Sequence, residues 1–465
     1  MVFSSLPFLF FFFPATLICY YAVPNKAKNA VLLLFSLLFY GYGEPVYILL
    51  MVGSILLNYT AGRLLGAFDE SEKKRKAVLV LCVIANLLLL GFFKYASLFV
   101  STVKLLPIFS FLPDPQIALP IGISFYTFQS MSYVIDTYRR NCAPQKNLIT
   151  FGTYVALFPQ LIAGPIVRYV DVETQLQHRT HSPVLFTNGV RLFLFGLCKK
   201  VLLANALGNI WDQCKAEAGV NPTLTAWVGI LAFTFQIFFD FSGYSDMAVG
   251  LGKMFGFEFV RNFNYPYTAD SITDFWRRWH ISLGTWFREY VYIPLGGNRR
   301  GKARQCLNIF IVWGLTGIWH GASWNFLLWG LYFGVLLTIE KFGLLQRLQK
   351  APRVLAHLYT LFFVVLGWVL FDFTHLRDMG AYFANLFTPQ NGLLTSDGLA
   401  LLISHLPLFV CAVVFSAPTA RKAFERWKSH RVYRVLEPAL GLAELVLCIA
   451  SLVSSTYNPF LYFRF

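Results

Sequence analysis

The chain has 465 residues, of which 57% are hydrophobic and only 13% are charged, about half the charged fraction of a soluble domain. Its net charge is +16, but the basic residues occupy short segments between apolar runs, which favours positive loops beside a membrane over a nucleic-acid-binding surface. The eight cysteines form no Cys-x-x-Cys pair, so neither a zinc site nor a disulfide framework is supported.

Apolar stretches recur along the whole chain, and many approach the roughly 17 to 25 residues that a helix needs to cross a bilayer. The first stretch lacks the basic start and the cleavage site of a signal peptide, so we expect it to be retained as a transmembrane helix. Spans are predicted at 7–23, 29–43, 46–65, 77–97, 118–137, 183–209, 224–241, 305–319, 322–340, 354–372, 398–416 and 437–455. The expected fold is an all-α polytopic membrane protein of about 11 to 12 transmembrane helices. No long polar segment separates them, which predicts one membrane domain over residues 1–465.

Two further apolar stretches, 150–166 and 243–259, are short or rich in Gly and Pro. They are interpreted as re-entrant or broken helices. Irregular backbone is tolerated at membrane depth only where protein or a water-filled cavity surrounds it. The breaks therefore predict a cavity inside the membrane body.

Basic residues fall on alternate connections between the predicted spans. They occupy 26–28, 73–76, 139–146, 299–304, 341–353 and 421–434, whereas 43–45, 106–117, 211–223 and 375–397 hold few of them. Because positively charged loops stay in the cytoplasm, this alternation predicts that both termini lie on the outer side of the cytoplasmic membrane.

Residues 236–330 concentrate polar and ionisable side chains in apolar surroundings. The candidates are Asp246, Asp274, Arg277, Arg278, His280, Arg288, Trp319, His320 and Asn325. Ionisable groups at membrane depth are costly, and they are usually paired or functional. Because no independent soluble domain is expected, any activity should lie in this motif-rich region.

His320 is the first candidate for chemistry. It falls at the junction of two apolar helices, where Gly321 and Ala322 allow close backbone approach. An imidazole titrates near neutrality and suits general-base work on a hydroxyl. The alternative is a buried histidine that packs and hydrogen-bonds without chemistry.

His280 follows Arg277 and Arg278 in a Trp-rich segment. One interpretation is an interfacial helix with Arg at the headgroups and Trp in the aromatic belt. Alternatively, Arg277, Arg278 and Arg288 bind the phosphates of an anionic donor from the cytoplasmic side. The nearby glycine-rich turn at 296–301 lacks the pattern of a phosphate-binding loop, and no Gly-x-Ser-x-Gly elbow indicates a serine hydrolase.

Three motifs carry a family resemblance: 274–283 (DFWRRWHISL), 288–298 (REYVYIPLGGN) and 317–322 (GIWHGA). Together they resemble the bacterial alginate O-acetyltransferase branch of the membrane-bound O-acyltransferase family. Supporting segments are 124–129, 158–166, 240–248 and 458–465. The likeness covers nearly the whole chain, and the motifs occur in the same order.

The resemblance implies a fold in which helices surround a central tunnel reached from both faces of the membrane. It implies that His320 is catalytic and that His280 occupies the second characteristic polar position, which is Asn in many family members. Arg277, Arg278 and Arg288 are then donor-binding candidates. Asp246, Asp274, Trp319 and Asn325 are motif residues expected along the tunnel.

The function implied is O-acyl transfer, most simply of an acetyl group from cytoplasmic acetyl-CoA or another acyl thioester. The acceptor would be a hydroxyl of a periplasmic or extracellular polysaccharide, reached directly or through a partner acyltransferase. No bound cofactor or metal is expected. Two alternatives stay open: transfer of D-alanine from a carrier protein to teichoic acid, and a polysaccharide transporter or scaffold subunit without chemistry.

Overall fold

The computed structural model describes residues 1–113, 115, 117–162, 164–428, 430–454 and 460–461. All regular elements among these residues are helical, which confirms the all-α fold class. The chain groups into two compact units, Met1–Phe193 with Tyr244–Arg261 and Leu194–Gly243 with Asn262–Phe465. A single membrane domain over residues 1–465 stays a prediction.

The first unit contains the helices of the N-terminal part of the chain. They are η1 (Phe8–Phe12), α1 (Phe13–Ala22), η2 (Asn25–Ala27), α2 (Lys28–Gly43), α3 (Ile48–Ala67), α4 (Glu72–Val103), η3 (Pro107–Phe109), α5 (Ile123–Tyr138), α6 (Leu148–Ala156), α7 (Phe158–Leu161) and α8 (Tyr169–Gln177). Helices α9 (Pro183–Cys198) and α11 (Thr223–Met254) contribute residues to both units.

The second unit holds the motif-rich region. Its further helices are η4 (Lys199–Ala204), α10 (Asn205–Ala216), η5 (Pro266–Thr268), α12 (Ile272–Arg278), α13 (Ile281–Phe287), η6 (Arg288–Tyr292), α14 (Lys302–His320), α15 (Trp324–Ile339), η7 (Glu340–Leu344), α16 (Leu345–Lys350), α17 (Arg353–Asp372), α18 (Leu376–Phe387), α19 (Ser396–Ser416), α20 (Pro418–Trp427) and α21 (Arg431–Ser454).

Seven helices in the described part of the chain are long and apolar enough to cross a membrane. They are Ile48–Ala67, Glu72–Val103, Thr223–Met254, Trp324–Lys350, Arg353–Asp372, Ser396–Ser416 and Val435–Ser454, and Phe8–Ala22 is a shorter apolar helix. The spans predicted at 29–43 and 118–137 correspond to α2 and α5, each of 16 residues. At 1.5 Å per residue, such a helix is about 24 Å long, a few ångströms short of the hydrocarbon core.

Buried polar contacts join helices within the first unit. The side-chain amides of Asn58 on α3 and Asn86 on α4 donate to each other's carbonyl oxygens at 3.1 and 2.9 Å. The guanidinium of Arg75, which is 2% exposed, donates to the carbonyls of Leu65 at 2.9 Å and Tyr138 at 2.7 Å. These hydrogen bonds satisfy buried polar groups that lipid hydrocarbon could not hydrogen-bond. Those of Arg75 also satisfy backbone carbonyls at the C-terminal ends of α3 and α5.

The two predicted interruptions have different outcomes. The stretch 150–166 is interrupted as predicted: α6 ends at Ala156 and the four-residue α7 contains Pro159; Ala163 lies outside the described residues. The prediction for 243–259 is wrong up to Met254, because α11 continues unbroken through its glycines. Gly250 lies against Gly189 of α9, and a Cβ on either would come within 2.6 Å of the other's carbonyl oxygen. These glycines permit close helix packing and do not break the helix.

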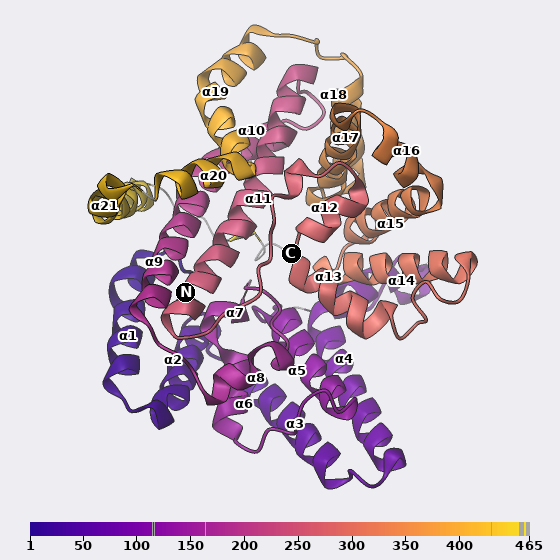
Figure 1. Cartoon of the computed structure of the whole chain (residues 1–465). Helices are drawn as coiled ribbons and strands as arrows, with labels where there is room; N and C mark the ends of the chain where they lie inside the picture. The colour runs from indigo at the N-terminus through magenta and orange to yellow at the C-terminus, as the bar shows by residue number, and fades with distance from the viewer. Residues whose placement is uncertain (114, 116, 163, 429, 455–459, 462–465) are drawn as a thin grey trace. The chain divides into compact units, whose positions relative to one another are not determined.

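In the second unit, α14 and α15 form a helical hairpin (Figure 1). A Cβ on Gly317 would collide with the carbonyl oxygen of Phe326, and a Cβ on Gly330 would collide with that of Trp313. The two glycines therefore allow the backbones to touch, and the hairpin sets the position of its turn, where His320 and Gly321 lie.

Candidate functional site

His280 occupies a strained turn between α12 and α13. Its φ and ψ are 46° and 53°, in the left-handed region that residues other than glycine rarely adopt. Two backbone bonds hold the turn: Ile281 N–H donates to Asn262 O at 3.0 Å, and Asn264 N–H donates to Arg278 O at 2.9 Å. Such strain persists where the surrounding structure over-determines it, and it concentrates at functional sites.

The His280 ring is buried among aromatic side chains. It is 3% exposed and meets the edge of Phe241 at a centroid distance of 4.7 Å. Its Nδ1 lies 3.1 Å from Asn262 Oδ1, whereas its buried Nε2 has no hydrogen-bond partner among the described residues. His280 lies outside the seven membrane-crossing helices, and burial lowers its pKa to about 3. The imidazole is therefore neutral near pH 7.

His320 is the last residue of α14 and is 6% exposed. Its ring lies against the ring edges of Trp329 at 5.0 Å and Phe371 at 5.3 Å between centroids. The Trp319 ring lies 6.0 Å from that of His280 and 5.2 Å from that of His320. The structure thus brings the two predicted histidines to one indole, and their catalytic roles stay a prediction.

Further indole and phenyl rings pack around α12. Trp276 lies 4.8 Å from both Trp313 and Phe333, and Trp279 lies 4.9 Å from Trp368. Since Trp313 is on α14, Phe333 on α15 and Trp368 on α17, this packing connects α12 to three longer helices. An apolar surrounding of this kind strengthens polar interactions inside it, because it lowers the local dielectric constant.

The three arginines differ in their partners. Arg278 donates to Asp274 at 2.8 Å and to Thr268 at 3.2 Å. The side chain of Arg288 is 70% exposed, with Glu289 at 3.5 Å.

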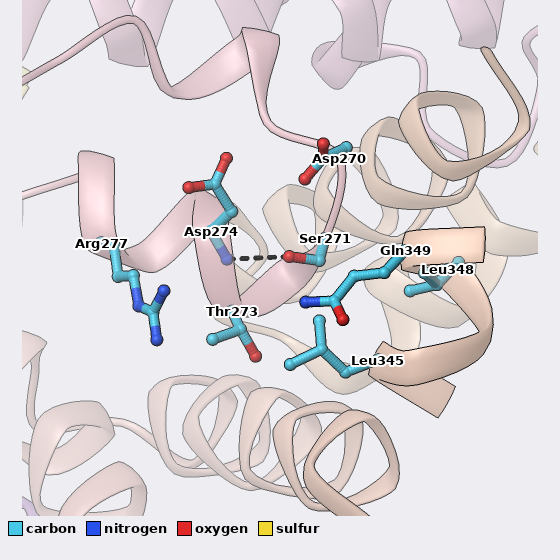
Figure 2. Close-up of a pocket in the computed structure, with 8 residues that line it drawn as sticks. All are labelled: Asp270, Ser271, Thr273, Asp274, Arg277, Leu345, Leu348 and Gln349. Carbon is cyan, nitrogen blue, oxygen red and sulfur yellow. Dashed lines mark hydrogen bonds between the residues drawn. The ribbon is translucent and has the colours of Figure 1, made fainter. Parts of the chain in front are cut away.

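Arg277 is exposed and borders a cavity of about 160 Å³ between α12 and α16. Figure 2 shows Arg277 and Thr273 on one side of this cavity and Gln349 and Leu345 on the other. Because Asp270 and Asp274 also line the cavity, its charged lining is mixed and not purely basic, as a site for phosphate alone would be.

Three motif residues have separate positions. Asp274 lies in the first turn of α12 and pairs with Arg278. Asn325 is fully buried and donates to the carbonyl of Phe371 at 2.9 Å, which satisfies the end of α17. Asp246 belongs to the α11 segment of the other compact unit. A tunnel role for each of them stays a prediction.

Glu340 was not singled out in the sequence, yet it holds the start of α12. Its fully buried carboxylate accepts from Ile272 N–H at 2.7 Å, Thr273 N–H at 2.8 Å and the Thr273 hydroxyl at 2.6 Å. The Ser271 hydroxyl accepts from Asp274 N–H at 3.0 Å. The first three N–H groups of α12 are therefore satisfied, and the negative charge lies at the positive end of the helix. The only feature of the sequence that points to this role of Glu340 is its position as an acidic residue at the end of an apolar span.

Among the described residues, no group of three or more His, Cys, Asp and Glu side chains is suited to hold a metal ion. Seven helices long and apolar enough to cross a membrane define a polytopic membrane protein, and a pair of buried histidines forms its candidate site. A model of the membrane-bound O-acyltransferase family matches residues 139–376, and the chain belongs to this family.

Named relatives fall into three kinds. The "Probable alginate O-acetylase AlgI" of Pseudomonas aeruginosa is 44% identical over 83% of this chain and 75% of its own length. The "Peptidoglycan O-acetyltransferase" of Helicobacter pylori is 35% identical over 81% of this chain and 78% of its own. The "Teichoic acid D-alanyltransferase" of Bacillus subtilis is 28% identical over 57% of this chain and 73% of its own. Together with the family match, these similarities identify the chain as a multi-pass membrane O-acyltransferase.

Proposed function

We propose that this O-acyltransferase moves an acetyl group from cytoplasmic acetyl-CoA to a hydroxyl that serves the O-acetylation of a polysaccharide outside the cytoplasm. The observation that carries the proposal is the pair of buried imidazoles, His280 and His320, whose ring centroids lie 6.0 and 5.2 Å from that of Trp319. The names of the two more similar relatives support acetyl as the transferred group and a polysaccharide as the final acceptor.

In the proposed reaction, His320 acts as the general base. The acceptor oxygen attacks the thioester carbonyl while the imidazole of His320 takes the hydroxyl proton. The tetrahedral intermediate then collapses, the carbon–sulfur bond breaks, and the same proton passes to the departing thiolate. General-base help of this kind is typically worth about a hundred- to ten-thousandfold in rate. The aromatic surroundings would protect the thioester by keeping water out.

The proposed orientation places the basic connections and the donor in the cytoplasm of a bacterial cell and both termini outside. Arg277 is the strongest donor-binding candidate, because it borders the cavity and, unlike Arg278, has no carboxylate partner within salt-bridge distance among the described residues. The guanidinium could donate two parallel hydrogen bonds to a pair of phosphate oxygens. The acceptor hydroxyl could belong to the polysaccharide itself or to a partner acyltransferase.

The alternative donor is a D-alanyl carrier protein, as the name of the B. subtilis relative suggests for that protein. Its lower identity over a smaller share of this chain makes it the second candidate. A transporter or scaffold without chemistry would not require an imidazole at position 320. It predicts that the protein tolerates loss of that side chain.

The deciding experiment incubates purified protein with acetyl-CoA and a soluble polysaccharide acceptor and measures free CoA and acetylated product. We expect His320→Ala and His320→Gln to lower transfer by about a hundredfold or more while the proteins keep their thermal unfolding temperature. Gln retains hydrogen bonding but takes up no proton at neutral pH, so it separates chemistry from packing. His375→Gln, at an exposed histidine, is the matched control. If His320→Gln transfers acetyl groups at nearly the wild-type rate, the general-base assignment is wrong.

A further inference from the structure

We infer that Asn262 is a positioning residue that fixes the tautomer and the direction of the His280 ring, so that Nε2 presents its lone pair to the substrate. The inference rests on the proposed function, but its principal test does not depend on activity. Asn262 is 1% exposed and lies 18 residues before His280 in the chain.

One oxygen atom of Asn262 meets three groups of the His280 turn. Its Oδ1 lies 3.1 Å from His280 Nδ1, 3.3 Å from Ser282 N and 3.0 Å from Ser282 Oγ. The backbone carbonyl of the same residue accepts from Ile281 N–H at 3.0 Å. Asn262 therefore contacts each of the three residues 280–282, through its side chain or its backbone.

These contacts decide which atom of the amide is oxygen. The backbone N–H of Ser282 can only donate, so the Asn262 atom that faces it must accept. A flipped amide would place an NH₂ group against this N–H, and two donors would face each other. Since Oδ1 is the acceptor, His280 Nδ1 must carry the hydrogen of the neutral ring.

The consequence for His280 is a defined tautomer. With the proton on Nδ1, the Nε2 atom has an unshared electron pair and no proton. This atom is buried and has no hydrogen-bond partner among the described residues. An unpaired buried acceptor is costly unless water or a ligand meets it. A hydroxyl donor other than the one whose proton His320 takes, such as a neighbouring hydroxyl of the acceptor, matches this open atom.

The contacts around the ring make this arrangement rigid. Phe241 and Trp319 pack on the ring, and the left-handed backbone of His280 fixes where the side chain leaves the turn. Asn262 belongs to a segment without helical structure, so its position depends on its bonds to the turn. Without Oδ1, the ring could carry its proton on Nε2. An Nε2–H group cannot accept a hydrogen bond from an approaching hydroxyl.

Solid-state ¹⁵N NMR of histidine-labelled, full-length protein in lipid bilayers tests the inference directly. The His280 signals are assigned by their absence in His280→Gln. In the wild type at pH 7 we expect a protonated Nδ1 and an unprotonated Nε2. A wild-type ring with its proton on Nε2 would overturn the inference, whatever the protein's activity.

Variants at position 262 extend the test to function. Asn262→Leu removes the acceptor, and we expect loss of the single tautomer together with at least about a tenfold fall in kcat with acetyl-CoA as donor. Asn262→Asp keeps an acceptor at Oδ1, and it should retain the Nδ1-protonated state. Asn264→Leu, at an exposed neighbour that uses only its backbone N–H, is the control and should leave both readouts unchanged.

If Asn262→Leu keeps the wild-type tautomer, Asn262 has no positioning role. If the tautomer changes but kcat does not, the inference about the ring holds and the proposed role of His280 in catalysis fails.

Discussion

At the scale of single residues, the imidazoles of His280 and His320 lie beside the indole of Trp319, and different contacts hold each ring in position. His280 depends on a strained backbone and on Asn262, which lies on a neighbouring segment. His320 depends on the end of α14 and on ring contacts from α15 and α17. The two rings can therefore be perturbed separately, which allows their roles to be distinguished by mutation.

Arg277 provides the first prediction at this scale. Arg277→Ala should raise the Michaelis constant for acetyl-CoA about tenfold or more, because a hydrogen bond to a charged group contributes about 1.5–3 kcal/mol. The measurement is initial rate against donor concentration in detergent-solubilised protein. Arg288→Ala is the comparison, since that side chain is 70% exposed and should have a smaller effect. Unchanged donor dependence in Arg277→Ala, Arg278→Ala and Arg288→Ala would assign these arginines to membrane anchoring.

At the scale of elements, the seven-residue helix α12 ends with Trp276, Arg277 and Arg278 of the Trp-Arg-Arg-Trp-His motif, and long-range contacts hold it in place. Glu340 satisfies its first N–H groups, while indoles on its sides pack against α14, α15 and α17. So short a helix is not stable alone, because nucleation is unfavourable. Its stability must come from these contacts.

Removal of the cap tests this dependence. We expect Glu340→Ala to lower the free energy of unfolding by about 2 kcal/mol or more, because two backbone N–H groups and a hydroxyl lose their buried acceptor. Glu340→Gln should recover little, since its NH₂ group would face one of those donors. Thermal unfolding and acetyl transfer are measured beside Lys341→Ala, an exposed neighbour. A wild-type unfolding temperature in Glu340→Ala would contradict the capping role.

The α14–α15 hairpin supplies a matched pair of glycines. A Cβ on Gly317 would collide with the backbone of α15, whereas a Cβ on Gly314 would meet nothing within 4 Å. Gly317→Ala should therefore separate the helices, displace His320 and lower both stability and activity. Gly314→Ala should be neutral or stabilising by up to about 1 kcal/mol, the difference in helix propensity. Equal behaviour of the two variants in unfolding and transfer assays would show that close approach at Gly317 is not required.

At the scale of the whole molecule, the distribution of basic residues predicts the orientation in the membrane. Ser71 precedes the basic start of α4, and Ser396 begins α19 after a connection with few positive charges. A cysteine introduced at Ser71 should be labelled from the cytoplasm, and one at Ser396 from outside. A membrane-impermeant maleimide applied to intact cells and to inverted vesicles gives the measurement, in a background without exposed native cysteines. Labelling of both positions from the same side would refute the topology.

The sequence by itself determined that the chain crosses a membrane many times, because hydrophobic length and charge placement are local properties of the chain. It also determined the family, since whole motifs around His280 and His320 are contiguous. Only the tertiary structure decided that α11 runs unbroken through its glycines, because this depends on packing against Gly189 of another helix. The same holds for Glu340, which bonds to Ile272 at a separation of 68 residues, and for Asn262, 18 residues before His280. Contacts between distant residues depend on how the chain folds back on itself, and no local pattern of hydrophobicity or charge encodes them.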